Sequence, residues 1–400
     1  MRTDYDALVL GAGVAGSSMA AMLAAQGWST ALMDRQRFPK HKVCGEFLSP
    51  ESRLMLSAMG LTEKVESLEP HVISRISLFL ARGGPIELPL PGTAIGVSRH
   101  RLDAALQRHA AAEGALLLQG GTVTAVIPYE HGYIVHVRQG GEVIEVTARI
   151  VVAAWGAGGQ GRLFGRYDNQ VEGGGRRKQR SVLAHERSSV GVKSHFVWPR
   201  STDSPGDAVE LYFFPGGYLG INGIECGRCN VAALLDREDI PRSHTTVEGM
   251  LKEAASRNAA LQRRMRDAQL VQGTEAAVAP VRIGKHPAPW RNIPHIGDAI
   301  GRIPPLCGDG MSMGLRSAQL CAAYAHRYLA GEWTYEQWRM AYTRAISSQF
   351  SGPLRWGKAV EGMLRHPAAS RLLPGLAKLA PRLACKFVEA TRLRISSLSE

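Results

Sequence analysis

The sequence predicts an α/β fold in which a domain with a mainly parallel sheet is interrupted by a second, mostly antiparallel sheet and followed by a helical tail. Two glycine-rich turns, each between a strand and a helix, occur near residues 11–16 and 297–310. Between them, short apolar runs such as 74–80 and 209–214 have the composition of strands in another sheet. This order is typical of a Rossmann-like domain that carries an inserted domain.

Composition excludes several classes of protein. The chain has 400 residues, of which 45% are apolar, and a net charge of +13. It is therefore too apolar for a disordered chain and too often interrupted by charge for a polytopic membrane protein. The basic residues form no stripe interleaved with aromatic side chains, so nucleic acid is not an expected partner. Six cysteines make no disulfide framework, and no signal peptide is visible, so we expect a cytoplasmic protein.

The first glycine-rich turn has the features of a dinucleotide site. An apolar run at 5–10 leads into Gly11, Gly13 and Gly16, and a helix over 17–26 and a strand over 30–34 follow. These glycines permit a tight turn, close approach of a pyrophosphate and packing of the helix on the strand. Asp34 ends the second strand, where a carboxylate binds a ribose diol. We place Ala15 and Arg35 in the same site.

The second glycine-rich turn indicates which dinucleotide binds. Gly297-Asp298-Ala299, a proline turn at Pro305 and the Gly308-Asp309-Gly310 turn precede a long helix. This segment resembles the second FAD motif of flavoprotein hydroxylases and geranylgeranyl reductases. The resemblance implies that Asp298 holds the ribityl chain and that the amides of 308–310, with Met311 beside them, face the flavin.

A third motif supports the same family. Residues 98–106, Ser-Arg-His-Arg-Leu-Asp-Ala-Ala-Leu, match the family's Arg-x-x-Leu-Asp-x-x-Leu helix start, whose arginine, Arg99 here, lies near the cofactor. Over about residues 5–330 the chain resembles the para-hydroxybenzoate-hydroxylase-like, or group A, flavoproteins, which include geranylgeranyl reductases and flavin halogenases. The resemblance implies a glutathione-reductase-type FAD domain, FAD as the cofactor and NAD(P)H as a transient reductant.

The segment at 38–51 is expected to reach the flavin. It contains Cys44, Gly45 and Glu46 where geranylgeranyl reductases carry Cys-Gly-Gly and halogenases Gly-Glu-Ser. Cys44 and Glu46 are therefore candidate catalytic residues, since a thiol there adjusts the flavin or donates a proton and a carboxylate holds a bound group. The alternative is that Cys44 packs as a small apolar side chain and that Gly45-Glu46 is only a turn.

Two stretches depart from the family pattern. At 148–162 the glycine turn with Gly156 is kept, but Trp155 replaces the family aspartate. In the family that aspartate is associated with both FAD and NADPH, so the sequence does not predict how the flavin is reduced. At 211–223 a substrate strand keeps Tyr212, Phe214 and Tyr218. These three either line the substrate pocket or pack within the sheet. The halogenase Trp-x-Trp-x-Ile-Pro signature is absent, and the lone Cys226-Gly-Arg-Cys229 has no second ligand pair, so no metal is expected.

These motifs give a division into domains. The FAD domain is expected to comprise 1–70, 98–160 and 272–340, and the substrate domain 71–97 and 163–271, with a single polar helix over 244–268. Residues 341–400 form a helical, basic C-terminal cap. This cap either packs against the body, which we favour, or lies on an anionic membrane or covers the pocket. For the protein as a whole, a membrane surface or an acyl carrier protein is a candidate partner beside the small-molecule substrate.

The family resemblance implies a monooxygenase. FAD reduced by NAD(P)H would form a C4a-hydroperoxide and hydroxylate an electron-rich aromatic or polyketide-like small molecule. One alternative is a geranylgeranyl-reductase-like flavoprotein that reduces a C=C bond. Another is an FAD-bearing binding module without turnover.

Overall fold

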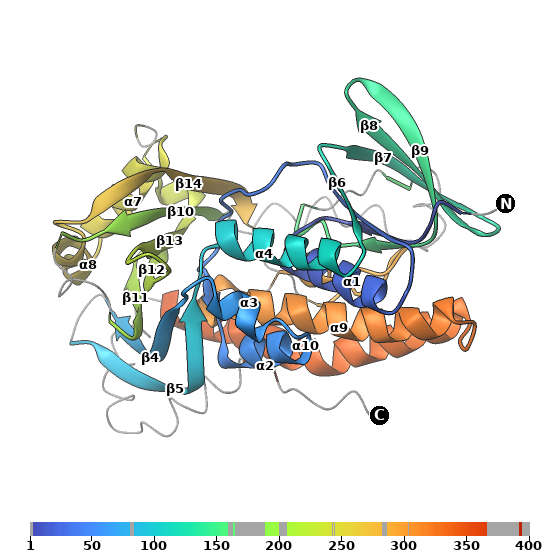
Figure 1. The fold of residues 1–400 in the computed structure, drawn as a ribbon. Helices are drawn as coiled ribbons and strands as arrows, with labels where there is room; N and C mark the ends of the chain where they lie inside the picture. The colour runs from blue at the N-terminus through green and yellow to red at the C-terminus, as the bar shows by residue number, and fades with distance from the viewer. Residues whose placement is uncertain are drawn as a thin grey trace, which may run out of the picture.

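The chain forms two sheets joined by helices and by a long connecting segment. A computed structural model describes residues 3–80, 84–158, 163–164, 189–199, 206–241, 243, 245–281, 286–302, 304–365 and 392–393. The two sheets lie at opposite ends of the molecule. Most of the helices lie between and beneath them, and the two helices Val247–Ser256 and Ala259–Arg264 lie on the outer side of the second sheet (Figure 1).

The first sheet is mainly parallel in its middle and antiparallel at one side. Its strand order is β6-β2-β1-β9-β8-β7. The strands are β1 (Tyr5–Leu10), β2 (Thr30–Asp34), β6 (Leu116–Gln119), β7 (Thr122–Tyr129), β8 (Gly132–Gln139) and β9 (Glu142–Ala153). β1 pairs in parallel with both β2 and β9, whereas β8 is antiparallel to its neighbours β7 and β9. Parallel strands need crossover helices, which cover one face of this sheet.

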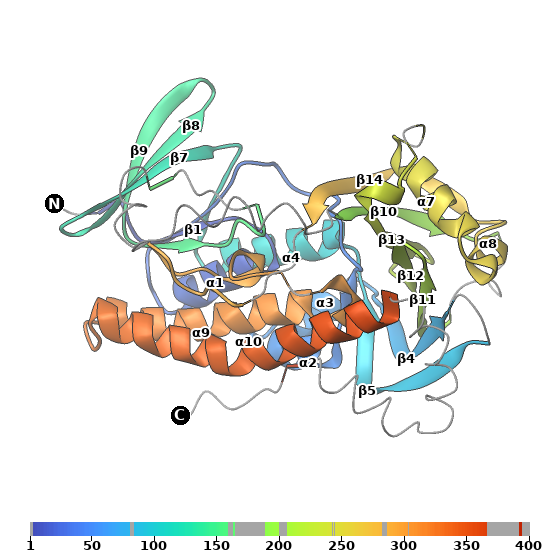
Figure 2. The same ribbon diagram turned by 180° about the vertical axis from the view of Figure 1, so that it is seen from behind.

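Four helices account for most of the remaining first domain. They are α1 (Val14–Ala25), α4 (Arg99–Ala112), α9 (Gly310–Leu329) and α10 (Tyr335–Arg365). Ala7 and Val9 of β1 pack with these helices in one core, and Leu8 and Leu10 pack on the other face against side chains of β7 and β8. The longest helices, α9 and α10, lie side by side in both views (Figure 2).

The second sheet has the order β14-β10-β13-β12-β11-β4-β5-β3. Its strands are β3 (Phe47–Leu48), β4 (His71–Phe79), β5 (Ile86–Gly96), β10 (Ser189–Val197), β11 (Ala208–Phe214), β12 (Gly217–Gly223), β13 (Cys229–Asp236) and β14 (Gln269–Val281). Neighbouring strands are antiparallel except for the parallel pair β4 and β11. The prediction of an α/β fold with a second, mostly antiparallel sheet is confirmed.

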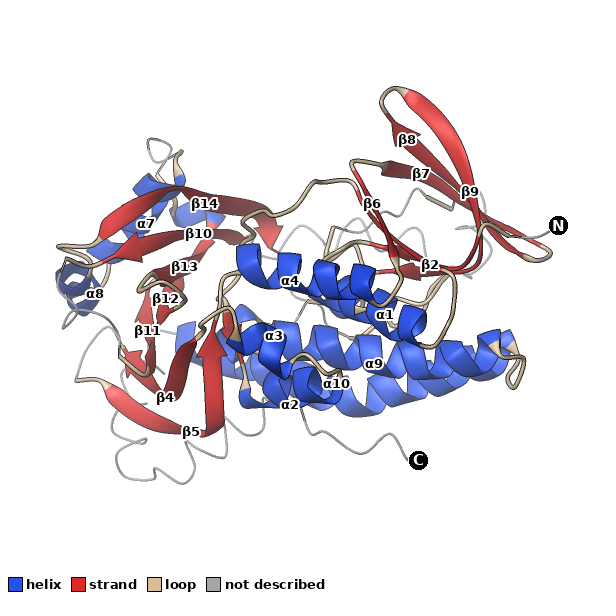
Figure 3. Ribbon diagram, viewed as in Figure 1, coloured by secondary structure: helices blue, strands red, loops and turns tan. Residues whose placement is uncertain are grey.

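The two faces of the second sheet differ. α7 (Val247–Ser256) and α8 (Ala259–Arg264) cover one face, where Val192, Leu219 and Val231 share a core with Leu251. Side chains alternate along a strand, so the residues between these core positions point to the opposite face. That opposite face meets the segment from residue 35 to residue 46, which crosses from the first sheet to the second (Figure 3).

Some predicted elements differ in the structure. The predicted single helix over 244–268 is two helices, because the Asn258 side chain accepts hydrogen bonds from the N–H groups of Ala260 and Leu261 and so starts α8 afresh. The second sheet continues to Val281, and α10 begins at Tyr335. Two short helices, α2 (Pro50–Ala58) and α3 (Thr62–Glu66), follow β3. Most of the predicted tail beyond residue 365 lies outside the described residues.

Candidate active site

The predicted phosphate loop lies between β1 and α1, and two of its positions admit only glycine. Gly11 has φ +119, and a Cβ there would lie 2.3 Å from the Ala154 carbonyl oxygen. A Cβ at Gly16 would lie 1.8 Å from the Gly11 oxygen. α1 has no acidic residue in its first turn and no side chain capping its N-terminus. Its free N–H groups therefore suit a phosphate.

Positive side chains surround the loop. An ideal Cβ at Gly13 would lie 3.3 Å from Lys42 Nζ and 3.5 Å from Arg99 Nη2. Asp103 holds both cations: its Oδ1 accepts from Arg99 Nε at 2.8 Å, and its Oδ2 lies 2.9 Å from Lys42 Nζ. Burial of the Asp103 carboxyl is outweighed by Arg99 and Lys42, so its pKa is lowered and it stays ionised. The two cations are thereby fixed beside the glycine loop.

Asp34 lies at the end of β2, as predicted. Its Oδ2 accepts from the N–H of Ala12 at 3.0 Å, and its Oδ1 from the N–H of Gln36 at 2.9 Å. Arg35 next to it is exposed. A carboxylate that is anchored to the loop backbone and only partly buried can accept from a ribose diol.

The second glycine-rich turn faces the same region from α9. Gly297 has φ +60, and a Cβ there would lie 3.0 Å from Ala15 Cβ, so this turn packs directly on α1. Asp298 is half-exposed and pairs with Arg302 at 3.4 Å, and Pro305 is exposed. Gly308 has φ +70 beside the Phe47 ring.

Asp309 immediately precedes α9, but its side chain makes no capping hydrogen bond. The amides of Gly310 and the buried Met311 start this helix. Asp309 is fully buried, and burial raises the pKa of its carboxyl to about 7. Asp309 Oδ1 lies 3.4 Å from Arg392 Nη1.

These features fit FAD. The glycine loop leaves no room for side chains, the first turn of α1 is uncapped, and two cations and one carboxylate lie where a pyrophosphate and a ribose would bind. The cofactor residues predicted from the sequence thus lie around one region at the junction of β1, α1 and α9. Their individual contacts with FAD stay predictions.

The segment at residues 44–46 is held between the two domains. Asn230 of β13 donates to the Cys44 carbonyl at 3.0 Å, and Cys44 Sγ accepts from the Glu46 N–H at 3.4 Å. Gly45 is exposed, whereas Glu46 is fully buried and has φ +53. A non-glycine residue in this conformation is strained unless its surroundings hold it.

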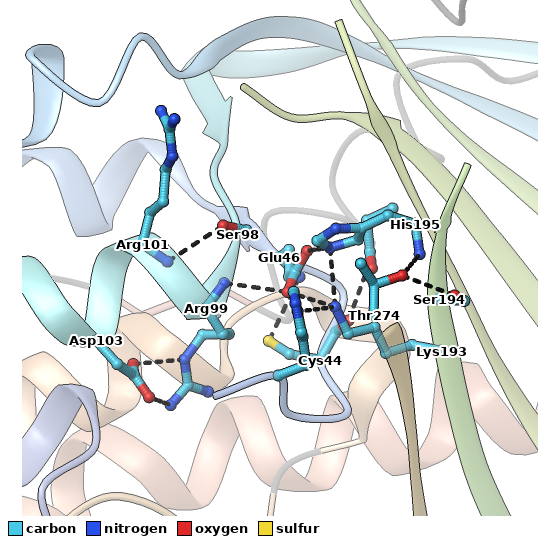
Figure 4. A network of polar contacts seen from close by, with 12 residues as sticks. Cys44, Glu46, Ser98, Arg99, Arg101, Asp103, Lys193, Ser194, His195 and Thr274 are labelled. Atoms are coloured by element: carbon cyan, nitrogen blue, oxygen red, sulfur yellow. Dashed lines mark hydrogen bonds and ion pairs between the residues drawn. The ribbon is translucent and has the colours of Figure 1, made fainter. Parts of the chain in front are cut away.

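The carboxylate of Glu46 joins α4 to β10 (Figure 4). Oε1 accepts from the Arg99 N–H at 3.0 Å and from Lys193 Nζ at 3.0 Å, and Oε2 lies 2.6 Å from His195 Nε2. Burial alone would raise the pKa of Glu46, but the hydrogen bond from His195 and the charge of Lys193 outweigh it. The pKa of Glu46 is therefore lowered, and the carboxylate is ionised.

This network leaves one polar atom unused. His195 Nε2 lies 2.6 Å from Glu46 Oε2, which can only accept, and 2.8 Å from Lys193 Nζ. Because Nε2 faces the ionised carboxylate, we assign the proton to Nε2. Nδ1 of His195 then bears a lone pair, and within the part of the chain that the structure describes this buried atom has no hydrogen-bond partner. A buried nitrogen without a partner, on a ring oriented by a carboxylate, is the arrangement of a general base.

Local structure explains why Lys193 and His195 point the same way. They are two residues apart on β10, so both lie on the face opposite the α7 and α8 core. Pairing between β10 and β14 shifts register between these two residues. Thr274 of β14 spans the irregularity, because its Oγ1 accepts from the His195 N–H at 2.9 Å. Such bulges re-aim side chains next to active sites.

Two further histidines border the network. The His41 ring stacks on the His100 ring, with centroids 4.7 Å apart, and meets the His195 ring edge-on at 5.0 Å. Burial and the charge of Lys193 lower the pKa of His41 to about 4, and the pKa of His100 is also lowered, chiefly by burial. Both are neutral at pH 7, so the centre holds proton acceptors around the single ammonium of Lys193.

Comparison with known proteins places this architecture in a family. The model of the FAD binding domain family matches residues 4–337 of the chain. The chain belongs to this family. It is an FAD-dependent oxidoreductase of the type that includes monooxygenases, halogenases and reductases.

Relatives of this FAD enzyme differ in activity. Over 333 residues it is 28% identical to a menaquinone reductase of Mycolicibacterium smegmatis, covering 80% of this chain and 76% of the relative. It is 25% identical to digeranylgeranylglycerophospholipid reductase 1 of Methanothermobacter thermautotrophicus (81% and 78% covered) and to squalene monooxygenase of Mus musculus (80% and 54% covered). A flavin-dependent brominase has a similar structure, with TM-score 0.74, 18% identity, and 96% and 94% of the two chains covered.

The predicted pocket aromatics of the FAD enzyme need a correction. Tyr212 and Phe214 lie on the face of β11 that packs under α7 and α8, and Tyr212 stacks on Phe79 at 4.4 Å. They therefore belong to the core and do not share the face of Lys193. Tyr218 points to that opposite face but is buried beside Phe213. The alternation of β11 does not reveal which of its faces is covered by helices.

Two other departures from the family pattern have structural explanations. In the stretch 211–223, the buried Asn222 side chain donates to the Glu46 carbonyl at 3.5 Å. Trp155 meets the buried His295 ring edge-on at 5.6 Å, and Gly156 has φ +79. Burial lowers the pKa of His295 to about 4, so Trp155 packs on a neutral ring.

Sequence reasoning missed Lys193, His195 and His41. In 189–197, Lys193 and His195 alternate with Val192 and Phe196, a pattern that is also typical of a strand with one solvent-exposed face, so the sequence contains no local sign that both are buried. Among the described residues, no helix has both the length and the apolar composition needed to cross a membrane.

Proposed function

We propose that this flavoprotein is a monooxygenase that hydroxylates an electron-rich aromatic or polyketide-like small molecule, with FAD reduced by NAD(P)H. The observation that carries the proposal is the buried Glu46–His195 pair with an unused Nδ1. Bound FAD would supply the electrons and the site at which oxygen is activated. The chain itself has to bind the substrate, remove its hydroxyl proton and exclude water.

The groups of the centre suit a substrate that loses a proton. A hydroxyl on an aromatic ring is more reactive toward an oxygen electrophile once it is deprotonated. His195 Nδ1 can accept that proton while Glu46 stabilises the charge that forms on the ring, and Lys193 stabilises the anionic oxygen. Neutral His41 and His100 supply further acceptors but no protons at pH 7.

Reduction of a C=C bond is the second candidate. It is favoured by the menaquinone reductase, which matches 80% of this chain. Such a reaction needs an acid that protonates carbon. Glu46 is ionised and His41 is neutral at pH 7, so the Lys193 ammonium, which is already bound to the Glu46 carboxylate, would have to supply the proton. The centre therefore supports hydroxylation better.

The experiment that tests the proposal measures whether an oxygen atom from O2 enters the product. Holoenzyme, NADPH and a panel of phenolic and resorcinol-type compounds are incubated under 18O2, and products are analysed by mass spectrometry. One 18O atom per product molecule is expected. A product that gains two hydrogens without oxygen under anaerobic conditions would identify a reductase. Absence of flavin reduction by NADPH and by NADH with every ligand would favour a binding module.

His195→Gln tests the proposed base. We expect hydroxylation to fall by about 100-fold, the usual contribution of a positioned base, with FAD content unchanged. His131→Gln is the matched control, since His131 is exposed in the hairpin between β7 and β8. Equal activity of His195→Gln and wild type would remove His195 from the mechanism.

A further inference from the structure

The position of Lys193 Nζ within its cluster resembles that of a bound metal ion. Lys193 is fully buried, and its Nζ lies 3.0 Å from Glu46 Oε1, 2.8 Å from His195 Nε2 and 3.3 Å from His41 Nδ1. The donor atoms of the three partner residues all lie within 4.8 Å of one another. One ammonium thus contacts two imidazole nitrogens and one carboxylate oxygen.

That donor set is one that divalent transition metals prefer. Two histidine nitrogens and one carboxylate oxygen bind Zn²⁺ or Co²⁺ with bonds of about 2.0–2.2 Å and leave further positions open. A metal in the place of Nζ would bind His195 through Nε2 and would displace the proton that Nε2 shares with Glu46, because metal ligands are deprotonated. The cluster therefore brings two imidazoles and one carboxylate together in the way a divalent metal needs.

The ammonium and a metal cannot bind together. Nζ lies within hydrogen-bond distance of each donor, so it fills the space between them, and two like charges so close repel strongly in a buried site. A metal that entered would have to displace the side chain of Lys193 from the interior.

We propose that the cluster of His41, Glu46 and His195 is a divalent-metal site in which the Lys193 ammonium takes the position of the metal and keeps transition metals out. Removal of the ammonium should then turn the cluster into a site for Zn²⁺ or Co²⁺. This inference does not depend on which reaction the flavoenzyme catalyses.

Metal titration of the holoenzyme tests it. Zn²⁺ binding to wild type, Lys193→Ala and Lys193→Ala/His195→Ala is measured by calorimetry, and Co²⁺ binding by the visible bands that report its ligand geometry. We expect Lys193→Ala to bind one Zn²⁺ at this site at least about 100-fold more tightly than wild type. The double variant should lose that affinity. Cys226 and Cys229 are present in all three proteins, so binding there appears equally in each.

The variants also need a test of folding, because Lys193→Ala leaves Glu46 without its ammonium. Lys193→Ser keeps a hydroxyl that can hydrogen-bond the carboxylate, and purification with Zn²⁺ supplies the missing charge. In both variants Zn²⁺ should raise the thermal unfolding midpoint, since a ligand that binds the folded state stabilises it. Folded variants that bind no more Zn²⁺ than the double variant would overturn the proposal. Equally tight, His195-dependent binding by wild type would do the same.

Discussion

At the scale of single residues, the hydrogen bonds of the Glu46 side chain offset the strain in its backbone. A φ of +53 in a glutamate costs on the order of 1–3 kcal/mol and persists only where the surroundings hold it. Here the Arg99 N–H, Lys193 Nζ and His195 Nε2 all bind one carboxylate. The strain and the binding together fix the segment that was predicted to reach the flavin.

Asp309 should contribute a part of the stability that falls as pH rises. Its pKa is raised from 3.8 to about 7, chiefly by burial, so the folded state binds its proton more tightly than the unfolded chain. This contribution is fully present below pH 4 and is lost as pH rises toward 7, by up to about 4 kcal/mol. Asp309→Asn should therefore gain stability relative to wild type between pH 4 and 8, measured as the free energy of unfolding in urea.

A control separates this effect from general changes in charge. Asp267→Asn alters an exposed carboxylate and should show no such trend with pH. If the difference between Asp309→Asn and wild type stayed constant across the pH range, Asp309 would not titrate as described.

At the scale of elements, α1 can pack only if residue 16 lacks a side chain. A Cβ at Gly16 would lie 1.8 Å from the Gly11 oxygen, which is backbone and cannot give way. Gly16→Ala should displace α1 from the loop, lower stability by about 2–4 kcal/mol and abolish retention of FAD on gel filtration. Gly158→Ala, where a Cβ meets nothing within 4 Å, is the control and should keep FAD. Tight FAD binding by Gly16→Ala would contradict the packing argument.

Prediction from sequence succeeded where function depends on neighbouring residues. β1, the glycine loop and β2 follow one another within residues 5–34, so spacing alone fixes their geometry. Glu46, by contrast, contacts Lys193 and His195, which follow it in the chain by 147 and 149 positions. No local sequence pattern predicts contacts over such separations. The sequence left Tyr212 and Phe214 either in the pocket or in the sheet packing for a related reason, because period-two alternation defines two faces but not which of them is covered.

At the scale of the whole molecule, FAD should connect the beginning of the chain to α9. Asp298 in the second turn was predicted to hold the ribityl chain, and Gly297 beside it packs against Ala15 of α1. Asp298→Ala should weaken FAD binding by about 10- to 100-fold, as expected for the loss of one hydrogen bond that a charged carboxylate accepts. Fluorescence titration of the apoprotein measures this, with Asp267→Ala as control. Unchanged affinity would exclude Asp298 as a ligand.

The uncapped start of α1 also has a consequence for the protein inside a cell. Without a phosphate, the first N–H groups of this helix have no side chain to accept their hydrogen bonds. The apoprotein should therefore open locally more often, and proteases degrade open states. Abundance of the protein should consequently follow the riboflavin supply of the organism, falling during vitamin starvation even when transcription is constant.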